Sequence, residues 1–587
     1  MHGDVNGYTR SEARDGMLVD WQVPIPMDDG LELRADIFRP QEQGRHPVIL
    51  SYGPYGKGSP FQLAYPSYWA AMVEEFPEIT LDSSGAYQNY EVVDPQRWVP
   101  DGYAIVRVDS RGAGCSPGIL DVLSTRETMD LHDCIEWASE QPWSTGRVGL
   151  CGISYYTIIG WLVAGTQPPS LSAMVAWEGV ADLYRDACYH GGIPSRFAEL
   201  WYPGEVLPVQ YGQGERSFHN PHTGQSAAGP VTLPEDELAL NRTEVAAEIS
   251  ARPLEDSWYT TRSAEWSKIR VPFLSAANWG GQGLHSRGNF EAFMNATAPQ
   301  KWLEVHGLEH WTLFYTDYGI SLQKRFLDHF LKGEDNGWDN EPPVRLQVRH
   351  VDGSTFERHE TEWPIERTQW TDLYLECQGK SLTNQPAAKT GSVNFDAPGR
   401  GITFWSPPFE QDTEITGPMA ATLFVSSSTS DADIFTVVHV VRPDGTEVVL
   451  RGSLDEYTPI AQGWLRASHR ELDDQRSLPY RPFHTHRTPA PLTPGKIYEL
   501  AVEIWPTSII VPRGYRIACT IRSTDYEYTE RLDELASEPP YPGAGCGPCL
   551  HGTPLDRGTE IARAQVSVHS GPRNQSKLIV PIVPATR

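Results

Sequence analysis

The stretch Arg147-Val148-Gly149-Leu150-Cys151-Gly152-Ile153-Ser154-Tyr155-Tyr156 decides the predicted fold of this 587-residue chain. It begins as a short apolar strand, turns through Gly152-x-Ser154, and leads into a helix-like run from Ile158 to Ala164. A small residue is needed in such a turn because the strand and the helix approach closely, and the turn pushes the serine hydroxyl out of the sheet. The common G-x-S-x-G pattern would place a glycine where Tyr156 stands. The strand–turn–helix context nevertheless predicts Ser154 as a nucleophile.

Strands and helical patterns alternate on both sides of this turn. An amphipathic helix is predicted from Thr128 to Gln141. The predicted strands are His46–Tyr52, Tyr103–Asp109, Leu171–Trp177, Val271–Ala277 and Lys301–Val305. Such alternation favours a parallel sheet with helices on both faces. The fold class is therefore α/β, and the serine turn makes an α/β-hydrolase core our prediction.

Two other regions have a different texture. Residues 182–265 are rich in Tyr, Trp, Pro, His and Gly, with helical stretches such as Glu235 to Ile249, and we interpret them as an inserted, mainly helical cap. From residue 345 to 587 the chain alternates in short β-rich runs, which are typical of a C-terminal β-sandwich or jelly roll. The core then occupies residues 1–181 and 266–344.

Composition excludes several classes of function. The net charge of -28 argues against a nucleic-acid partner and against anionic membranes, because both need a basic surface. The N-terminus lacks a secretory signal, and no stretch of about 18 apolar residues exists that could span a membrane. We therefore expect a cytoplasmic protein that acts on a small molecule. The sequence leaves a homo-oligomer open.

We expect neither a metal nor a cofactor. Eight cysteines in a chain of this length do not form a disulfide framework. Cys546 and Cys549 stand as Cys-Gly-Pro-Cys, but without a second pair or a surrounding βαβ pattern they read as loop cysteines rather than as a zinc or redox motif. His484 and His486 lie in a Pro-rich loop that has no carboxylate at ligand spacing.

A nucleophilic serine needs a base, and in this fold class the order along the chain is serine, acid, histidine. The strand that begins at Lys301 runs directly into His306-Gly307-Leu308-Glu309-His310. We predict His310 as the base, with His306 as the alternative.

Several segments, taken in order, resemble the cocaine esterase and X-prolyl dipeptidyl peptidase family of serine hydrolases. These segments are Ser51–Lys57, Val108–Gly118, Glu136–Trp137, Gln141–Ser144, Gly146–Gly149, Gly152–Tyr155, Asp431–Phe435 and Arg466–Arg470. The resemblance spans about residues 45 to 585. It implies a core, a helical cap and a jelly roll. It also implies that Ser154 attacks a carbonyl carbon, that His310 transfers the proton, and that the Tyr55 hydroxyl and the Tyr155 N–H stabilise the oxyanion.

The chain departs from this family at the acid. The family has an Asp just after the strand that ends at Ala277, whereas Gly281 stands at the corresponding position here. Glu178 follows the strand Leu171–Trp177, and its carboxylate would lie at the carboxyl end of the sheet, where ligands bind. We predict Glu178 as the acid that orients His310. Asp182 is the alternative, and an incomplete triad is a third reading.

These residues predict a serine hydrolase that cleaves an ester or amide with a hydrophobic acyl group through an acyl-enzyme on Ser154. An X-prolyl-type dipeptidyl peptidase is one alternative, and it would need a carboxylate near the pocket to bind the α-ammonium group. A non-catalytic, degenerate hydrolase with a ligand-binding jelly roll is another, motivated by Gly281.

Overall fold

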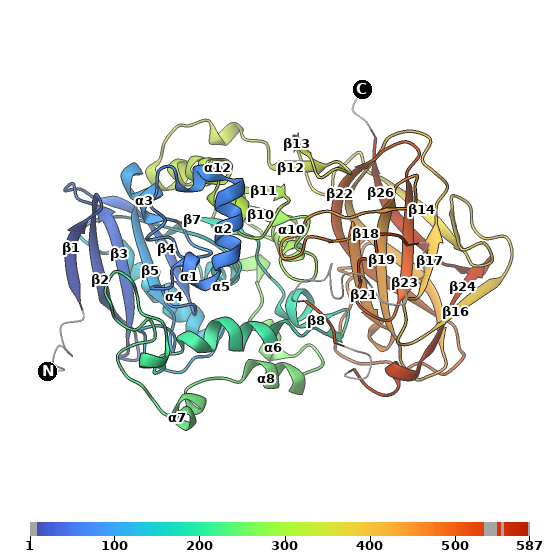
Figure 1. The fold of residues 1–587 in the computed structure, drawn as a ribbon, viewed down its shortest axis with the longest axis horizontal. Helices are drawn as coiled ribbons and strands as arrows, with labels where there is room; N and C mark the ends of the chain where they lie inside the picture. The colour runs from blue at the N-terminus through green and yellow to red at the C-terminus, as the bar shows by residue number, and fades with distance from the viewer. Residues whose placement is uncertain (1–8, 533–548, 553–556, 585–587) are drawn as a thin grey trace.

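The computed structural model describes residues 9–532, 549–552 and 557–584. Figure 1 shows two parts side by side, an N-terminal α/β part and a C-terminal part made of strands. In the described residues, no helix is both long enough and apolar enough to cross a membrane.

The N-terminal part is built on an eleven-stranded sheet with the order β1-β2-β3-β5-β4-β6-β7-β10-β11-β12-β13. Its strands are β1 (Arg10–Arg14), β2 (Met17–Pro26), β3 (Glu32–Pro40), β4 (His46–Gly53), β5 (Ala104–Asp109), β6 (Ser144–Ile153), β7 (Leu171–Trp177), β10 (Phe273–Asn278), β11 (Lys301–His306), β12 (Val344–Arg349) and β13 (Thr355–Glu360). The seven strands from β5 to β12 are mutually parallel, and antiparallel strands flank them at both edges. Because helices cover both faces, these central strands read as nearly continuous apolar runs.

Helices pack against the sheet, as the alternation predicted. The helices that contact its strands are α4 (Thr125–Ser139), α5 (Tyr155–Thr166), α10 (Ser286–Asn295), α12 (Asp317–Leu327) and the short α3 (Pro95–Trp98). Further helices of this part are α1 (Phe61–Ala64), α2 (Pro66–Glu75) and α11 (Thr312–Tyr315). Helix α5 follows β6 directly and is almost entirely buried, which explains its apolar sequence. The predicted α/β core is confirmed.

The segment between β7 and β10 forms no part of this sheet. It contains a short hairpin, β8 (Tyr189–His190) with β9 (Ile193–Pro194), and the short helices α6 (Phe197–Trp201), α7 (Glu235–Leu240), α8 (Val245–Ala251) and α9 (Ser257–Thr260). Wider helical turns precede and follow α6, at Leu183–Cys188 and Tyr202–Val206. In Figure 1 this segment runs along the lower side of the core.

The C-terminal part is a separate thirteen-stranded sheet that bends back on itself. Its strands are β14 (Gln369–Glu376), β15 (Ser381–Thr383), β16 (Gly391–Asp396), β17 (Ile402–Trp405), β18 (Thr413–Ser427), β19 (Asp433–Val441), β20 (Glu447–Val448), β21 (Ala461–Arg466), β22 (Tyr498–Val511), β23 (Arg516–Arg522), β24 (Gln565–Gly571), β25 (Asn574–Gln575) and β26 (Lys577–Val583). Strand β18 pairs with β22, β24 and β26, and the pairing with β26 closes a barrel-like ring.

The core sheet extends past the domain boundary expected at residue 344. Strand β12 is parallel to β11, and β13 is antiparallel to β12, so residues 344–360 belong to the first sheet. The pattern of apolar residues changes at this point because β13 is a partly exposed antiparallel edge strand. The change does not mark the start of a new sheet. The second sheet begins only with β14.

The two parts meet at backbone level near the ends of the core strands. A Cβ atom on Gly280, just after β10, would lie 2.3 Å from the Gly452 Cα of the C-terminal part. The Ser453 N–H donates to the Gly280 carbonyl at 3.2 Å, and the His310 N–H donates to the Ser453 carbonyl at 2.9 Å. The C-terminal part therefore helps to position the loop that carries His310.

Candidate active site

Ser154 stands in a strained turn between β6 and α5. Its φ of 54° and ψ of -115° lie outside the regions that L-residues prefer, and such a conformation costs about 1–3 kcal/mol and concentrates at functional sites. The Ser154 N–H donates to the Trp177 carbonyl at 3.1 Å and to the Glu178 carbonyl at 3.0 Å, which ties the turn to the end of β7. A Cβ on Gly152 would lie only 2.6 Å from the Tyr156 Cβ, so this position requires glycine.

The structure also explains why Tyr156 can replace the second glycine of the common motif. The Tyr156 ring lies against Gly53 at the end of β4, where an added Cβ would be 2.9 Å from the Tyr156 Cε1. Gly53 on the neighbouring strand therefore leaves room for the Tyr156 ring, so a glycine at position 156 is not needed.

Glu178 and His310 form a buried pair. The Glu178 Oε2 lies 2.8 Å from the His310 Nδ1, and both side chains are almost fully buried. The other oxygen, Oε1, lies 2.9 Å from the His306 Nε2 and accepts from the Asn278 amide at 3.1 Å. Burial alone would raise the pKa of Glu178, but His310 and His306 outweigh it and lower the pKa to about 2. Glu178 is therefore a carboxylate at neutral pH.

His310 faces a second carboxylate. Its Nε2 lies 3.3 Å from the Glu91 Oε1, so one glutamate approaches each ring nitrogen. Burial lowers the pKa of His310, but the charges and hydrogen bonds of Glu178 and Glu91 more than offset this and raise it to about 9. In this arrangement His310 is an imidazolium at neutral pH.

The hydrogen-bond partner of Ser154 is a different histidine. The His285 Nε2 lies 3.1 Å from the Ser154 Oγ, and the His285 ring stacks on His310 with centroids 4.2 Å apart and an interplanar angle of 8°. Burial and the neighbouring His310 charge lower the pKa of His285 well below its usual value, so the ring is neutral. Its Nδ1 has no hydrogen-bond partner among the described residues. The sequence pattern predicted neither His285 nor Glu91 as a site residue.

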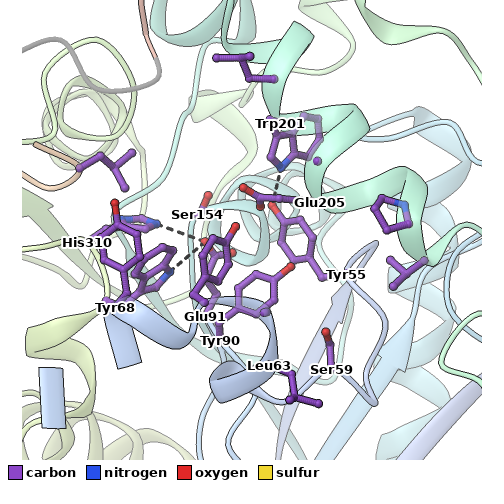
Figure 2. Close-up of a pocket in the computed structure, with 18 of the residues that line it drawn as sticks. Tyr55, Ser59, Leu63, Tyr68, Tyr90, Glu91, Ser154, Trp201, Glu205 and His310 are labelled. Carbon is purple, nitrogen blue, oxygen red and sulfur yellow. Dashed lines mark hydrogen bonds and ion pairs between the residues drawn. The ribbon is translucent and has the colours of Figure 1, made fainter. Parts of the chain in front are cut away.

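Tyr55 lies beside Ser154 with its hydroxyl proton available. The Trp201 indole N–H donates to the Tyr55 Oη at 3.0 Å, as Figure 2 shows, so the oxygen acts as an acceptor and its own O–H is free to donate. Burial and the Glu91 charge raise the Tyr55 pKa far above the physiological range, which keeps the phenol protonated. Tyr155 is the first residue of α5, and its backbone N–H is among the four that lack an acceptor within the helix.

Two cavities meet at Ser154. The larger has a volume of about 660 Å³, and Tyr55, Glu91, Ser154, Trp201, Glu205 and His310 are among the residues that line it. Figure 2 shows these six side chains around it. The smaller cavity, of about 50 Å³, is mainly apolar and also reaches Ser154 and His285. His310 and Glu91 line only the larger one.

The alternative base, His306, and the alternative acid, Asp182, lie away from Ser154. His306 lies on the far side of Glu178, with its Nδ1 2.6 Å from the Glu304 Oε2, and is fully buried. Asp182 caps the following helical turn and pairs with the Arg185 guanidinium at 2.8 Å. Neither side chain is bonded to Ser154 or His310 in the described structure.

The donor atoms of Glu178, His285 and His310 lie within 4.8 Å of one another, which is close enough to consider a metal. The two imidazoles are stacked nearly parallel, however, and nitrogen lone pairs in the planes of parallel rings do not converge on one ion.

The Arg185 guanidinium donates to the His484 carbonyl at 2.8 Å, and this charge opposes a cation at His484 and His486. Cys549 packs against Gly283, and Cys546 lies outside the described residues.

The chain is similar to known proteins over nearly its whole length. Residues 29–312 match the X-Pro dipeptidyl-peptidase (S15 family) domain, and residues 336–579 match the X-Pro dipeptidyl-peptidase C-terminal non-catalytic domain. A cocaine esterase from Rhodococcus sp. (strain MB1 Bresler) is 26% identical, with 96% of this chain and 98% of that protein covered. A putative Xaa-Pro dipeptidyl-peptidase from Streptomyces avermitilis is 24% identical, with 90% and 81% covered.

The structure of a CocE/NonD family hydrolase from Staphylococcus aureus has a TM-score of 0.82 at 30% identity and covers 97% of this chain and 94% of its own. The fold is thus of the α/β-hydrolase type, with a separate β-rich C-terminal domain. The chain belongs to the S15 family of hydrolases, together with cocaine esterase and X-Pro dipeptidyl-peptidase relatives.

Proposed function

We propose that this protein is a serine hydrolase that cleaves a carboxylic ester or amide through an acyl-enzyme on Ser154. The observation that carries the proposal is the strained turn that presents the Ser154 hydroxyl to a cavity of about 660 Å³, beside the Glu178–His310 pair. We also propose that residues 182–265 act as a cap over this cavity and that the C-terminal strands form a jelly roll. The cap assignment is supported by Trp201 and Glu205, which come from this segment and line the cavity.

The proposed reaction starts from the neutral form of His310, after the imidazolium that Glu178 and Glu91 favour has lost its Nε2 proton. The Ser154 Oγ then forms a bond to the substrate carbonyl carbon, and its proton passes to the His310 Nε2. The Tyr55 O–H and the Tyr155 N–H donate to the oxygen that becomes negative. The bond to the leaving group breaks as His310 returns the proton to it. Water then attacks the acyl-enzyme and gives a proton to His310, and the acid is released as His310 returns that proton to the Ser154 Oγ.

His310 is the better base of the two histidines near Ser154. A general base must accept a proton, and Glu178 at the His310 Nδ1 stabilises the resulting imidazolium. His285 has no acceptor at its Nδ1 in the described structure, and burial opposes its protonation. In this mechanism the His310 Nε2 leaves Glu91 and turns to Ser154, while His285 holds the serine hydroxyl in position.

The two histidines are expected to differ sharply on substitution. His285→Gln removes one neutral hydrogen bond to Ser154, a contact with a net contribution of about 1 kcal/mol, so kcat should fall only about tenfold. His310→Ala removes the base and should cost orders of magnitude more. Steady-state kinetics of both variants measure the difference. The reverse order of effects would make His285 the base.

Tyr55→Phe is expected to reduce kcat by about 10²–10³-fold, because it removes one oxyanion donor while the ring stays in place. KM should change little, since the donor acts on charge that develops in the transition state. The matched control is Tyr68→Phe, which alters another phenol of the same cavity. Equal effects of the two substitutions on kcat would remove Tyr55 from the oxyanion hole.

A fluorophosphonate probe tests the proposed class directly, because it phosphonylates an activated serine without requiring knowledge of the substrate. The wild-type protein should be labelled on the peptide that contains Ser154, and Ser154→Ala should not be labelled. A wild-type protein that resists the probe would favour a non-catalytic hydrolase fold. A panel of esters, amides and Xaa-Pro peptides then ranks the substrate classes. We expect esters to react fastest, because ester cleavage has a lower activation barrier than amide cleavage.

A further inference from the structure

We propose that Arg451 of the C-terminal part is a positioning residue for the reaction at Ser154, because it joins the loop that carries His310 to the end of α2. Its guanidinium contacts Glu309, the residue before His310, and Glu75, the last residue of α2. Among the described residues that line the two cavities at Ser154, Arg451 does not appear, so it would act through His310 and not on the substrate. This inference rests on the proposed function and adds to it a role for the C-terminal part.

Arg451 stands on a short hairpin formed by residues 450–458, which we call the clamp hairpin. The clamp hairpin lies between β20 and β21 of the C-terminal sheet. The Leu450 N–H donates to the Thr458 carbonyl at 3.0 Å, and the Thr458 N–H donates to the Leu450 carbonyl at 3.0 Å. These two bonds pair the arms of the hairpin and fix the backbone at the residue before Arg451. The guanidinium therefore projects from a backbone that is itself held in place.

Glu309 connects the Arg451 guanidinium to the loop of the base. Both oxygens of the Glu309 carboxylate contact the guanidinium, and the Oε2 accepts from the Arg451 Nη2 at 2.5 Å. The same Oε2 accepts from the Thr312 hydroxyl at 3.0 Å, at the start of α11. Leu308, on the other side of Glu309, has a φ of 74°, and surrounding contacts must hold a residue other than glycine in this conformation. The ion pair with Arg451 is one such contact, directly before His310.

The clamp hairpin also bonds to the backbone of His310 itself. The His310 N–H donates to the Ser453 carbonyl at 2.9 Å, and the Ser453 N–H donates to the Gly280 carbonyl at 3.2 Å. One hairpin thus fixes His310 through its backbone, with Ser453, and fixes the residue before it through an ion pair, with Arg451. A displacement of a catalytic group by about 1 Å can lower a rate about 100-fold. The position of the hairpin therefore bears directly on the base.

Glu75 is the second carboxylate that Arg451 binds. The Glu75 Oε2 lies 2.7 Å from the Arg451 Nη2, and the Oε1 lies 3.2 Å from the Nη1, so the pair is bidentate. Helix α2 ends with Glu74 and Glu75 and has no basic residue in its last turn, an arrangement that the helix dipole disfavours. Arg451 supplies the missing cation. Because α2 also carries Tyr68, which lines the large cavity, the guanidinium ties one wall of this cavity to the base loop.

The exposure of the three side chains separates positioning from folding. The side chains of Arg451, Glu75 and Glu309 are 33%, 44% and 26% exposed. Ion pairs that are this exposed contribute little to the free energy of unfolding. Replacement of Arg451 should therefore leave the protein folded, and a large loss of kcat would report the position of His310.

The first test compares the steady-state kinetics of Arg451→Gln and Arg487→Gln with p-nitrophenyl butyrate. Arg487 is the matched control, because it also joins the C-terminal part to another segment, through Glu255 at 3.4 Å, and lines neither cavity at Ser154. Arg451→Gln should lower kcat at least about tenfold, whereas Arg487→Gln should keep the wild-type kcat. Equal kcat values in the two variants, with an active wild type, would overturn the proposal and leave the proposed function intact.

The pH profile of kcat distinguishes positioning from a general loss of structure. Burial lowers the pKa of His310, but Glu178 and Glu91 outweigh it and raise the pKa to about 9. His285, which stacks on His310, is neutral and adds no charge. A loop that carries His310 away from its two carboxylates lowers this pKa, so the midpoint of the rise in kcat should move to lower pH in Arg451→Gln. A lower kcat at an unchanged midpoint would mean only fewer active molecules, against the proposal.

A double-mutant cycle tests whether Arg451 acts through Glu309. Glu309→Gln should lower kcat by about the same factor as Arg451→Gln, and the double variant should lose no more than the worse single variant, because both substitutions break one contact. Arg451→Lys should recover part of the loss, since its ammonium keeps the charge but cannot form paired bonds to two carboxylates. Losses that multiply in the double variant would show that the two residues act independently and would contradict the proposal.

Hydrogen exchange followed by mass spectrometry separates this inference from the proposed function. The His310 amide is bonded to the clamp hairpin, so the peptide that contains residues 309–312 should exchange at least about tenfold faster in Arg451→Gln than in the wild type. Arg487→Gln should leave its exchange unchanged. This result would support the clamp even if a fluorophosphonate failed to label Ser154. Wild-type exchange of the same peptide in Arg451→Gln would refute the clamp whether or not the protein hydrolyses esters.

Discussion

Ser154→Ala is expected to lower kcat by about 10⁶-fold, since removal of the nucleophile from a serine hydrolase site leaves only binding and oxyanion stabilisation. The substitution removes a single oxygen whose hydrogen-bond partner is His285, so the fold should persist. Initial rates with a chromogenic ester, together with a thermal unfolding curve, measure both expectations.

Ser172→Ala is the matched control, because Ser172 lies on β7, in the same sheet, and its hydroxyl donates to the Ser170 carbonyl at 3.2 Å, away from the cavity. This variant should retain wild-type activity. A Ser154→Ala protein that keeps more than about a hundredth of the wild-type kcat would place the chemistry on another residue.

Glu178→Gln is expected to lower kcat by about 10⁴-fold, the effect of neutralising the acid of a catalytic triad while its shape is kept. Glutamine cannot stabilise the His310 imidazolium, and it offers its neighbours only one oxygen in place of two. The pKa of His310 should fall as well, because the Glu178 charge is the largest of the effects that raise it to about 9. The activity that remains should therefore reach its plateau at lower pH than in the wild type.

Two further variants separate this effect from a loss of structure. Glu304→Gln changes the carboxylate on the far side of His306, 2.6 Å from its Nδ1, and should retain kcat within about tenfold. Asp182→Asn tests the alternative acid, which pairs with Arg185, and should behave in the same way. Near-normal turnover in Glu178→Gln, or a large loss in Asp182→Asn, would reassign the acid.

The residues of the proposed site that the sequence indicated follow directly from strands of the central sheet. Ser154 and Glu178 come immediately after β6 and β7, and His310 follows β11, so parallel strand order alone brings them to one edge. Asn278 ends β10, the strand after which the family carries its acid, and its amide donates to the Glu178 Oε1. In the proposed mechanism the acid therefore lies one strand away from its position in the family.

The residues that the sequence did not predict lie in connections whose path depends on tertiary contacts. Glu91 belongs to a long loop and owes its position to the pairing of Val92 with Gly152 and to a backbone hydrogen bond from Ile153. Glu205 lies in the insertion between β7 and β10. His285 precedes α10, and no local pattern distinguishes it from a packed histidine. The hydrophobic periodicity of a segment does not predict tertiary contacts such as these.

The domain boundary illustrates the same limit. The alternation of β12 and β13 resembles that of the C-terminal strands, but strand partners are chosen by long-range packing, and these two strands complete the first sheet. The local pattern correctly indicated that these residues form strands, but it assigned the strands to the wrong sheet.

Trapping the acyl-enzyme on Ser154 tests the proposed mechanism without any assumption about the natural substrate. The protein is mixed with an excess of p-nitrophenyl butyrate, quenched in acid within milliseconds to seconds, and digested for mass spectrometry. We expect a butyryl group on the peptide that contains Ser154, formed at the rate of the p-nitrophenol burst and absent from Ser154→Ala. Turnover of the ester with no acylated Ser154 at any quench time, or with the acyl group on another residue, would contradict it.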